Sequence, residues 1–197
     1  MARPQGSQSV QIAVRLTRQP HNFSEWLADG AAFEAAGAHA LWVDLAPAPT
    51  LDPLAVTAAL AAVTFRSMLV TTLPAGQAPS EAEARALATI ARLSHGRLGI
   101  VADPGRSGQL AGIAGLRVFR RLPGHLETFE HIGESGEPEG WIAAPPPDSR
   151  GAWRATLLDA AERGVRGLLV PADPRLLDIL RNPGDPGDRR DLQLAVG

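Results

Sequence analysis

The sequence contains no cysteine and no lysine. Without cysteine, the chain can form no disulfide, no thiol nucleophile and no cysteine-ligated metal site, although this absence does not identify the redox compartment. All 19 basic residues are arginine, and with 21 acidic residues they give a net charge of −2. This near-neutral balance offers no electrostatic footprint for a polyanion, so we expect no nucleic-acid partner.

Long apolar runs and the common catalytic motifs are also missing. No uninterrupted apolar stretch approaches the roughly 18–20 residues of a membrane span, and none of signal-peptide length precedes the first strand-like segment. We therefore expect a soluble, cytoplasmic protein with no membrane partner. The chain has no G-x-G-x-x-G, no P-loop, no G-x-S-x-G and no cluster of metal-ligand spacing, so these sites are not predicted.

The length and composition suit one well-buried core. With 197 residues and a hydrophobic fraction of 45%, the chain falls in the usual size range of a single domain. We expect one domain over residues 10–197, preceded by a disordered N-terminal extension at residues 1–9.

Short β-rich runs alternate with alanine-rich stretches of helical period. Most of the runs are apolar on both faces, which is typical of strands in a covered parallel sheet. The expected strands cover residues 11–16, 40–45, 67–73, 98–102, 116–122, 140–144, 167–172 and 191–197.

Capping residues mark the helices between these strands. Asn22 with Glu25 and Ser80 with Glu83 have capping-box spacing, whereas Asp52 and Asp173 each precede a proline that suits the first helical turn. A further helix is expected at residues 151–164, and the segments 103–115 and 123–135 look stunted.

A strand–helix–strand repeat along the whole chain predicts a parallel sheet with right-handed crossovers. About eight strand candidates favour an α/β fold, a compact (βα)8 barrel with shortened loops and helices in the middle of the chain. An incomplete barrel and an open sheet are the alternatives.

Five short features follow one another in the first half of the chain. A Gly and a Trp-Val surround the second strand, an Asp-Pro helix rich in alanine ends in Thr, and a long helix closes with Leu-Ser-x-Gly-Arg. They stand at Gly37, Trp42-Val43, Asp52-Pro53, Thr64 and Leu93-Ser94-His95-Gly96-Arg97. Over residues 10–101 the chain resembles the bacterial luciferase-like monooxygenase family, with a fainter resemblance over residues 151–172.

The resemblance implies an eight-stranded βα barrel that binds FMN or a deazaflavin coenzyme across the C-terminal mouth of its strands. It implies an oxidoreductase or monooxygenase that acts on a small organic substrate. The family commonly pairs its barrels through the early helices, and the helix at residues 54–63 is apolar nearly all the way round. We therefore expect a homodimer or heterodimer that buries this helix.

Three stretches depart from the family pattern. The family carries a histidine after the acid that follows Trp42-Val43, whereas this chain reads Asp44-Leu45-Ala46. Residues 102–105 replace the usual glycines, and residues 143–149 replace a Gly-Thr-Pro-like turn. The alternative function is therefore a non-catalytic relative that binds flavin or pairs with a catalytic homologue. A scaffold barrel without a ligand is a third interpretation.

Candidate site residues are those at the C-terminal ends of strands, where barrel enzymes place their chemistry. In the family-based model, Asp44 orients substrate as the catalytic residue, Thr71 and Thr72 position the flavin ring, and Arg120 or Arg121 holds its phosphate. Adjacent strand residues point to opposite faces, so at most one of the two arginines can face the interior.

Two further segments have a structural alternative. Asp103 is a candidate cofactor contact or a helix N-cap, as Asp173 is. The run Ser94-His95-Gly96-Arg97 lies at the entrance to a strand, so we interpret it structurally. Gly96 ends a helix, Arg97 binds helix carbonyls, and His95 is exposed.

Overall fold

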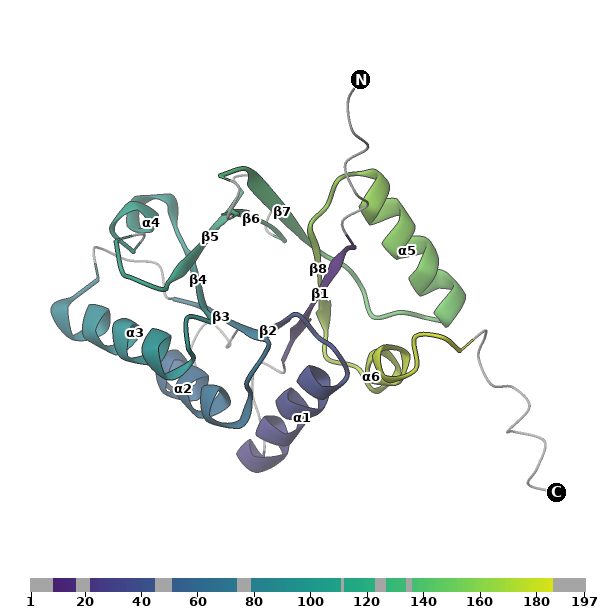
Figure 1. The fold of residues 1–197 in the computed structure, drawn as a ribbon, viewed down its shortest axis with the longest axis horizontal. Helices are drawn as coiled ribbons and strands as arrows, with labels where there is room; N and C mark the ends of the chain where they lie inside the picture. The colour runs from purple at the N-terminus through teal and green to yellow at the C-terminus, as the bar shows by residue number, and fades with distance from the viewer. Residues whose placement is uncertain are drawn as a thin grey trace.

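Eight strands form a closed barrel in chain order, with β1 paired to β8 (Figure 1). The structure, a computed structural model, describes residues 9–16, 22–44, 51–73, 79–110, 112–122, 127–133 and 136–185. The strands are β1 Gln11–Arg15, β2 Ala40–Val43, β3 Met68–Thr72, β4 Leu98–Ala102, β5 Arg117–Arg121, β6 Thr128–Ile132, β7 Pro138–Ala143 and β8 Gly167–Pro171. The compact α/β barrel predicted from the sequence is confirmed.

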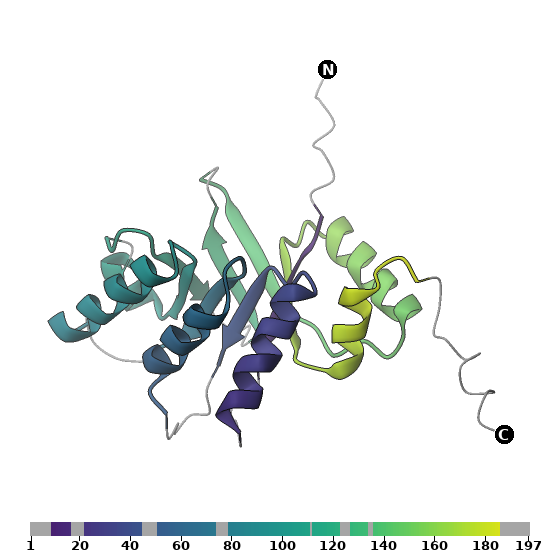
Figure 2. The ribbon, with the colours of Figure 1, turned by 60° about the horizontal axis from the view of Figure 1, so that its bottom comes forward.

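The helices lie on the outside of the barrel, and none covers the side formed by β6 and β7 in the described part of the chain (Figure 1). In both ribbon views α2 lies beside α3, and α1 lies beside α6 (Figures 1 and 2). The helices are α1 Phe23–Ala35, α2 Pro53–Val63, α3 Glu81–Leu93, α4 Pro104–Leu110, α5 Arg150–Glu162 and α6 Pro174–Arg181. In the part of the chain that the structure describes, no helix is long and apolar enough to cross a membrane.

The predicted capping residues begin their helices as expected. The Asn22 side chain accepts from two backbone N–H groups of α1 and donates to Glu25 at 2.8 Å. Asp52, Ser80 and Asp173 likewise accept backbone N–H groups in the first turns of α2, α3 and α6. These bonds satisfy donors that a helix start leaves unpaired, so local sequence determines where these helices begin.

The middle of the chain differs from the strand–helix repeat. β6 lies in the segment 123–135, where we expected no strand, and it runs antiparallel to both β5 and β7. The expected strands at 140–144 and 167–172 are therefore the seventh and eighth, and β8 closes the barrel against β1. The expected strand at 191–197 lies outside the described residues.

Aromatic side chains fill the centre of the barrel. Trp42, Phe119, Phe129 and Trp141 are each no more than 2% exposed. The Trp42 ring centroid lies 5.3 Å from that of Phe119 and 5.0 Å from that of Phe129, while Phe119 and Trp141 are 5.9 Å apart. Gly167 admits the Trp141 ring, because a Cβ there would lie only 2.3 Å from a ring carbon. The packed centre separates two polar ends.

A buried carboxylate anchors the N-terminal end of the barrel. Glu34 in α1 is 7% exposed, and its oxygens accept from the backbone N–H groups of Phe65 at 2.8 Å, Arg66 at 2.8 Å and Ser67 at 2.7 Å. Burial raises the pKa of Glu34, but these three donors and the charge of Arg97 outweigh it and hold the pKa below its ordinary value. Glu34 therefore joins α1 to the turn that precedes β3.

The run at residues 94–97 has the structural role that the sequence predicts. Gly96 has a φ of 76° and its N–H bonds the carbonyl of Ala91, which ends α3. The Arg97 guanidinium donates to the carbonyls of Ser94 at 2.9 Å, Ser67 at 2.7 Å and Thr64 at 2.7 Å. Arg97 thereby satisfies carbonyls at the ends of two helices and at the start of β3.

Candidate functional site

The C-terminal mouth of the barrel gathers polar residues from five of its strands. Parallel strands bring their last residues to one end, and the antiparallel β6 brings its first residues to that same end. Polar residues there whose position faces the interior are Arg15 at the end of β1, Asp44 after β2, Thr72 in β3, Arg121 in β5 and Glu127 before β6. They form what we call the mouth cluster.

Arg15 is central to the mouth cluster. Its Nη2 lies 2.5 Å from Glu127 Oε2, and its Nε lies 3.9 Å from Asp44 Oδ2. The side chains of Arg15 and Asp44 are 15% and 16% exposed, whereas Glu127 is 54% exposed. A planar guanidinium between two carboxylates fixes their positions, so Asp44 is held at the mouth by a charged neighbour.

The two threonines of β3 face opposite ways. Thr71 is fully buried on the face that carries Leu69 toward the helices, and its hydroxyl donates to the Val43 carbonyl at 3.3 Å. Thr72 follows Val70 on the interior face, and its buried Oγ1 has no hydrogen-bond partner among the described residues. Thr72 therefore has an unused hydrogen-bond donor and acceptor at the mouth. An unpaired buried hydroxyl of this kind costs free energy.

The two arginines of β5 are separated in the same way. Arg120 is on the outer face, where it pairs with Glu130 Oε1 at 2.5 Å. Arg121 shares the interior face with Phe119, and its guanidinium carbon lies 5.5 Å from the Phe129 ring centroid. The structure therefore brings Arg121, and neither Arg120 nor Thr71, to the mouth interior.

Asp103 directly follows β4, at the same end of the barrel as the mouth cluster. It is exposed at the start of α4, and its backbone carbonyl accepts from Arg106 N at 2.9 Å and Ser107 N at 3.1 Å. These two backbone bonds place Asp103 at the start of α4, as its alternative role at the beginning of a helix requires. His95 is likewise exposed, at the opposite end of the barrel, with a φ of 53°.

The mouth cluster has groups that suit a flavin or deazaflavin. Trp42 and Phe129 are paired in strand register with Arg15 and Arg121, so their rings form an apolar floor beneath the polar groups. The unpaired Thr72 Oγ1 can hydrogen-bond a ring heteroatom, and Arg121 can bind a phosphate. Residues 17–21, 45–50, 74–78 and 123–126, which follow four of the strands and include Ala46, lie outside the described residues.

Sequence reasoning missed two members of the mouth cluster, Arg15 and Glu127. Alternation from Ala13 places Arg15 on the interior face, but the face that Ala13 occupies is known only from the structure. Glu127 reaches the mouth only because β6 is antiparallel, and no pattern in the sequence indicated that reversal.

Comparison with known proteins finds only distant structural similarity. No family model and no curated protein matches the sequence. One similar structure is riboflavin lyase with modified FMN and its substrate riboflavin, at 20% identity and a TM-score of 0.40, covering 52% of this chain and 32% of that one. Another is an F420-dependent secondary alcohol dehydrogenase with an F420-acetone adduct, at 13% identity and a TM-score of 0.42, covering 82% and 58%.

This chain thus spans less than two thirds of the length of either structure. The two matches are a distant structural similarity to these two enzymes. At these identities and TM-scores they carry no argument about the activity of this chain.

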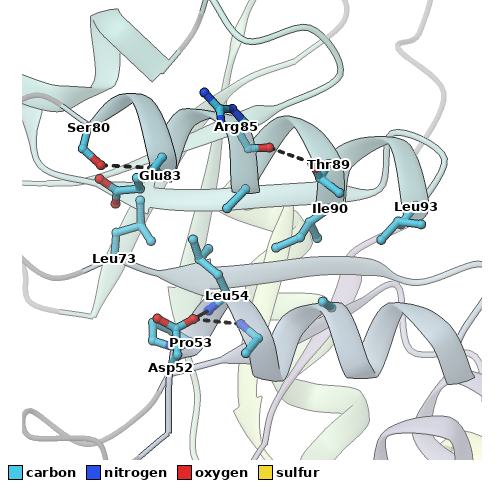
Figure 3. A pocket seen from close by; sticks show the side chains of 14 residues that line it. Asp52, Pro53, Leu54, Leu73, Ser80, Glu83, Arg85, Thr89, Ile90 and Leu93 are labelled. Carbon is cyan, nitrogen blue, oxygen red and sulfur yellow. Dashed lines mark hydrogen bonds between the residues drawn. The ribbon is translucent and has the colours of Figure 1, made fainter.

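A groove between α2 and α3 is a second feature of the surface. It has a volume of about 850 Å³, and Leu54, Leu73 and Ile90 line it from the two helices and the end of β3 (Figure 3). At the C-terminal end of α3, Leu93 extends this apolar surface and is 60% exposed. Val56, by contrast, is 3% exposed in the barrel core, so α2 is only partly covered within one chain.

Proposed function

We propose that the chain binds FMN or a deazaflavin coenzyme at the mouth cluster and acts as an oxidoreductase or monooxygenase on a small organic substrate. The observation that carries this proposal is the unpaired, buried Thr72 hydroxyl on the interior face at the C-terminal end of the barrel. Flavin rings present several hydrogen-bonding atoms, and strand ends at this face are where barrel enzymes bind their ligands.

Each residue of the mouth cluster has a distinct role in this proposal. The cofactor, when bound, supplies the electron transfer. Thr72 hydrogen-bonds the ring, and Arg121 binds the phosphate as a charge-assisted fork. Asp44 orients the substrate through a hydrogen bond, and Arg15 is a positioning residue that keeps the Asp44 carboxylate in place.

The absorbance spectrum of the purified protein, followed by titration with each cofactor, tests this function. We expect saturable binding of one cofactor, with substrate-dependent turnover. Thr72→Val should weaken cofactor binding by about tenfold, the effect of one hydrogen bond. Thr156→Val is the matched control, because Thr156 lies on α5, lines neither the mouth cluster nor the α2–α3 groove, and donates to the Ala152 carbonyl of its own helix. Binding of neither cofactor to the wild-type protein would overturn the proposal.

The alternative is a non-catalytic relative that binds a partner, and the α2–α3 groove favours it. Tight cofactor binding without turnover of any substrate, in a protein that assembles through α2 and α3, would support this alternative. An Asp44→Asn variant separates the two functions, because it should reduce turnover in the enzyme and leave assembly unchanged in the partner-binding protein.

We further propose that the α2–α3 groove binds the same groove of a second copy, so that the chain is a homodimer. Such an isologous contact covers Leu54, Ile90 and Leu93 of both copies at once. We prefer the homodimer to a heterodimer because a single contact between two copies covers the apolar residues of both grooves.

A further inference from the structure

The N-terminal end of the barrel holds a second polar cavity, of about 460 Å³, on the opposite side of the aromatic centre from the mouth cluster. Phe119 and Trp141 form its floor, and residues from the starts of the parallel strands form its walls. The polar wall residues are Gln11, His39, Arg66, Arg97, Arg117, His131, Glu139 and Arg166.

The charge in this cavity is strongly unbalanced. Four arginines and one glutamate line it, which leaves an excess of three positive charges, or two when the nearby Glu34 is counted. The whole chain carries a net charge of −2, so this concentration is local. Positive charges in a concave surface raise the potential there and attract anions.

The arginines of the cavity have different roles. The Arg97 guanidinium donates hydrogen bonds to backbone carbonyls, and Arg66 Nη2 donates to the Glu34 carbonyl at 3.5 Å. Arg166 Nε lies 3.6 Å from Glu139 Oε1, and that carboxylate also lies 3.9 Å from His131 Nδ1. The one acidic side chain of the wall is therefore shared between two basic groups.

Arg117 is the exception, because no described residue forms an ion pair or hydrogen bond with its guanidinium. It is half-buried at the start of β5, and the charge that it projects onto His131 helps to lower the pKa of that imidazole, after burial as the larger cause. The lowered pKa keeps His131 neutral near neutral pH, so the uncompensated charge beside it is that of Arg117, which a bound anion can pair.

The floor adds an unused donor to these cations. The Trp141 side chain is 1% exposed, and its indole N–H has no hydrogen-bond partner among the residues that the structure describes. A buried N–H of this kind normally has a partner. The cavity thus combines a cationic wall, a buried donor and an apolar aromatic floor.

We propose that this cavity binds the phosphate group of a small anionic metabolite, with Arg117 as its principal ligand. Arginine matches phosphate through paired N–H donors, and the cavity volume exceeds that of a bare ion, so an organic remainder can lie on Phe119 and Trp141. The inference is independent of the proposed flavin function, because it rests on residues at the other end of the barrel.

Isothermal titration with pyrophosphate, at fixed low ionic strength, tests this site. We expect saturable binding to the wild-type protein and about tenfold weaker binding to Arg117→Gln. Arg163→Gln is the matched control, because it removes one positive charge from an exposed position at the end of α5. Arg120→Gln should likewise leave pyrophosphate binding unchanged, because Arg120 lies on the outer face of β5, where it pairs with Glu130.

Glu139→Gln should change the affinity for pyrophosphate in the opposite direction to Arg117→Gln. Removal of the Glu139 carboxylate, the one acidic group among the described residues of the wall, should tighten pyrophosphate binding severalfold. A purely structural role of this residue would change the unfolding temperature alone. Citrate distinguishes a phosphate site from a general polyanion site, and it should bind more weakly than pyrophosphate. Absence of saturable binding, equal losses in Arg117→Gln and Arg163→Gln, or preference for citrate would each overturn the proposal.

Discussion

The packing of Trp141 against Gly167 makes a quantitative prediction about stability. A Cβ at position 167 would lie 2.3, 2.5 and 2.6 Å from three atoms of the indole ring, whereas ordinary contacts begin near 3.4 Å. In Gly167→Ala the ring must therefore move by about 1 Å. Trp141 is 1% exposed and packs edge-on against Phe119, so the interior has little room for this movement.

Overpacking of this kind typically costs about 1–3 kcal/mol. For a domain of this size each kcal/mol lowers the melting temperature by about 2–4 °C, so the upper end of that range predicts a fall of about 6–12 °C. Thermal unfolding followed by circular dichroism measures it. Gly140→Ala is the control, because a Cβ on that neighbouring β7 residue meets no atom within 4 Å.

A double-mutant cycle checks the cause of the destabilisation. In a Trp141→Phe background the smaller ring leaves room for the new methyl group, so Gly167→Ala should cost less there than in the wild-type protein. Equal melting temperatures for Gly167→Ala and Gly140→Ala would refute the argument that the interior is rigidly packed around Trp141.

Three further predictions concern charge and assembly. Glu34→Gln should lower the free energy of unfolding by about 2 kcal/mol, because an amide NH₂ then faces backbone donors. Since the folded pKa of Glu34 lies below its ordinary value of 4.5, its stabilisation is present above that pH and is lost as the pH falls through the folded pKa, which urea unfolding across pH will show. The pKa of His131 is lowered from 6.5 chiefly by burial and further by the charge of Arg117. In an NMR titration, Arg117→Gln should therefore raise the pKa of His131, and an unchanged pKa would contradict the coupling of the two residues. Leu93→Glu should shift the protein toward monomer in sedimentation equilibrium, whereas Leu158→Glu, at a similarly exposed position on α5, should not; equal effects would count against the α2–α3 contact.

Local signals in the sequence predicted most of the helices, because capping depends on residues a few positions apart. Asn22, Asp52 and Ser80 each accept the N–H groups that their spacing indicates. The parallel strands were also predictable, because burial on both faces requires apolar runs. β4, for example, is buried along its whole length between Leu98 and Ala102.

β6 was not predictable by the same reasoning, because its sequence and its direction both differ from those strands. The segment Thr128–Ile132 places Phe129 and His131 inside and Glu130 outside, so it has no apolar run. β6 pairs antiparallel to β5, and residues 122–127 alone separate the two strands, which the strand–helix repeat does not anticipate.

The sequence predicted at which strand ends the candidate residues lie. It did not predict which face of the strand each side chain occupies. Alternation showed that only one of Arg120 and Arg121 can point inward, but the strand register needed to choose between them came from the pairing of Arg121 with Phe129. The same holds for Thr71 and Thr72. Arg15, Asp44 and Glu127 meet through tertiary structure alone, at separations of up to 112 residues.

Titration of the Arg121→Gln and Arg120→Gln variants with FMN and with the deazaflavin coenzyme tests the central claim most directly. The two substitutions are adjacent in sequence and identical in charge, but only Arg121 faces the mouth cluster. The account predicts that Arg121→Gln weakens binding of the cofactor by about tenfold or more while Arg120→Gln binds as the wild-type protein does. Equal affinities in the two variants, or a loss confined to Arg120→Gln, would contradict a cofactor site at the C-terminal mouth.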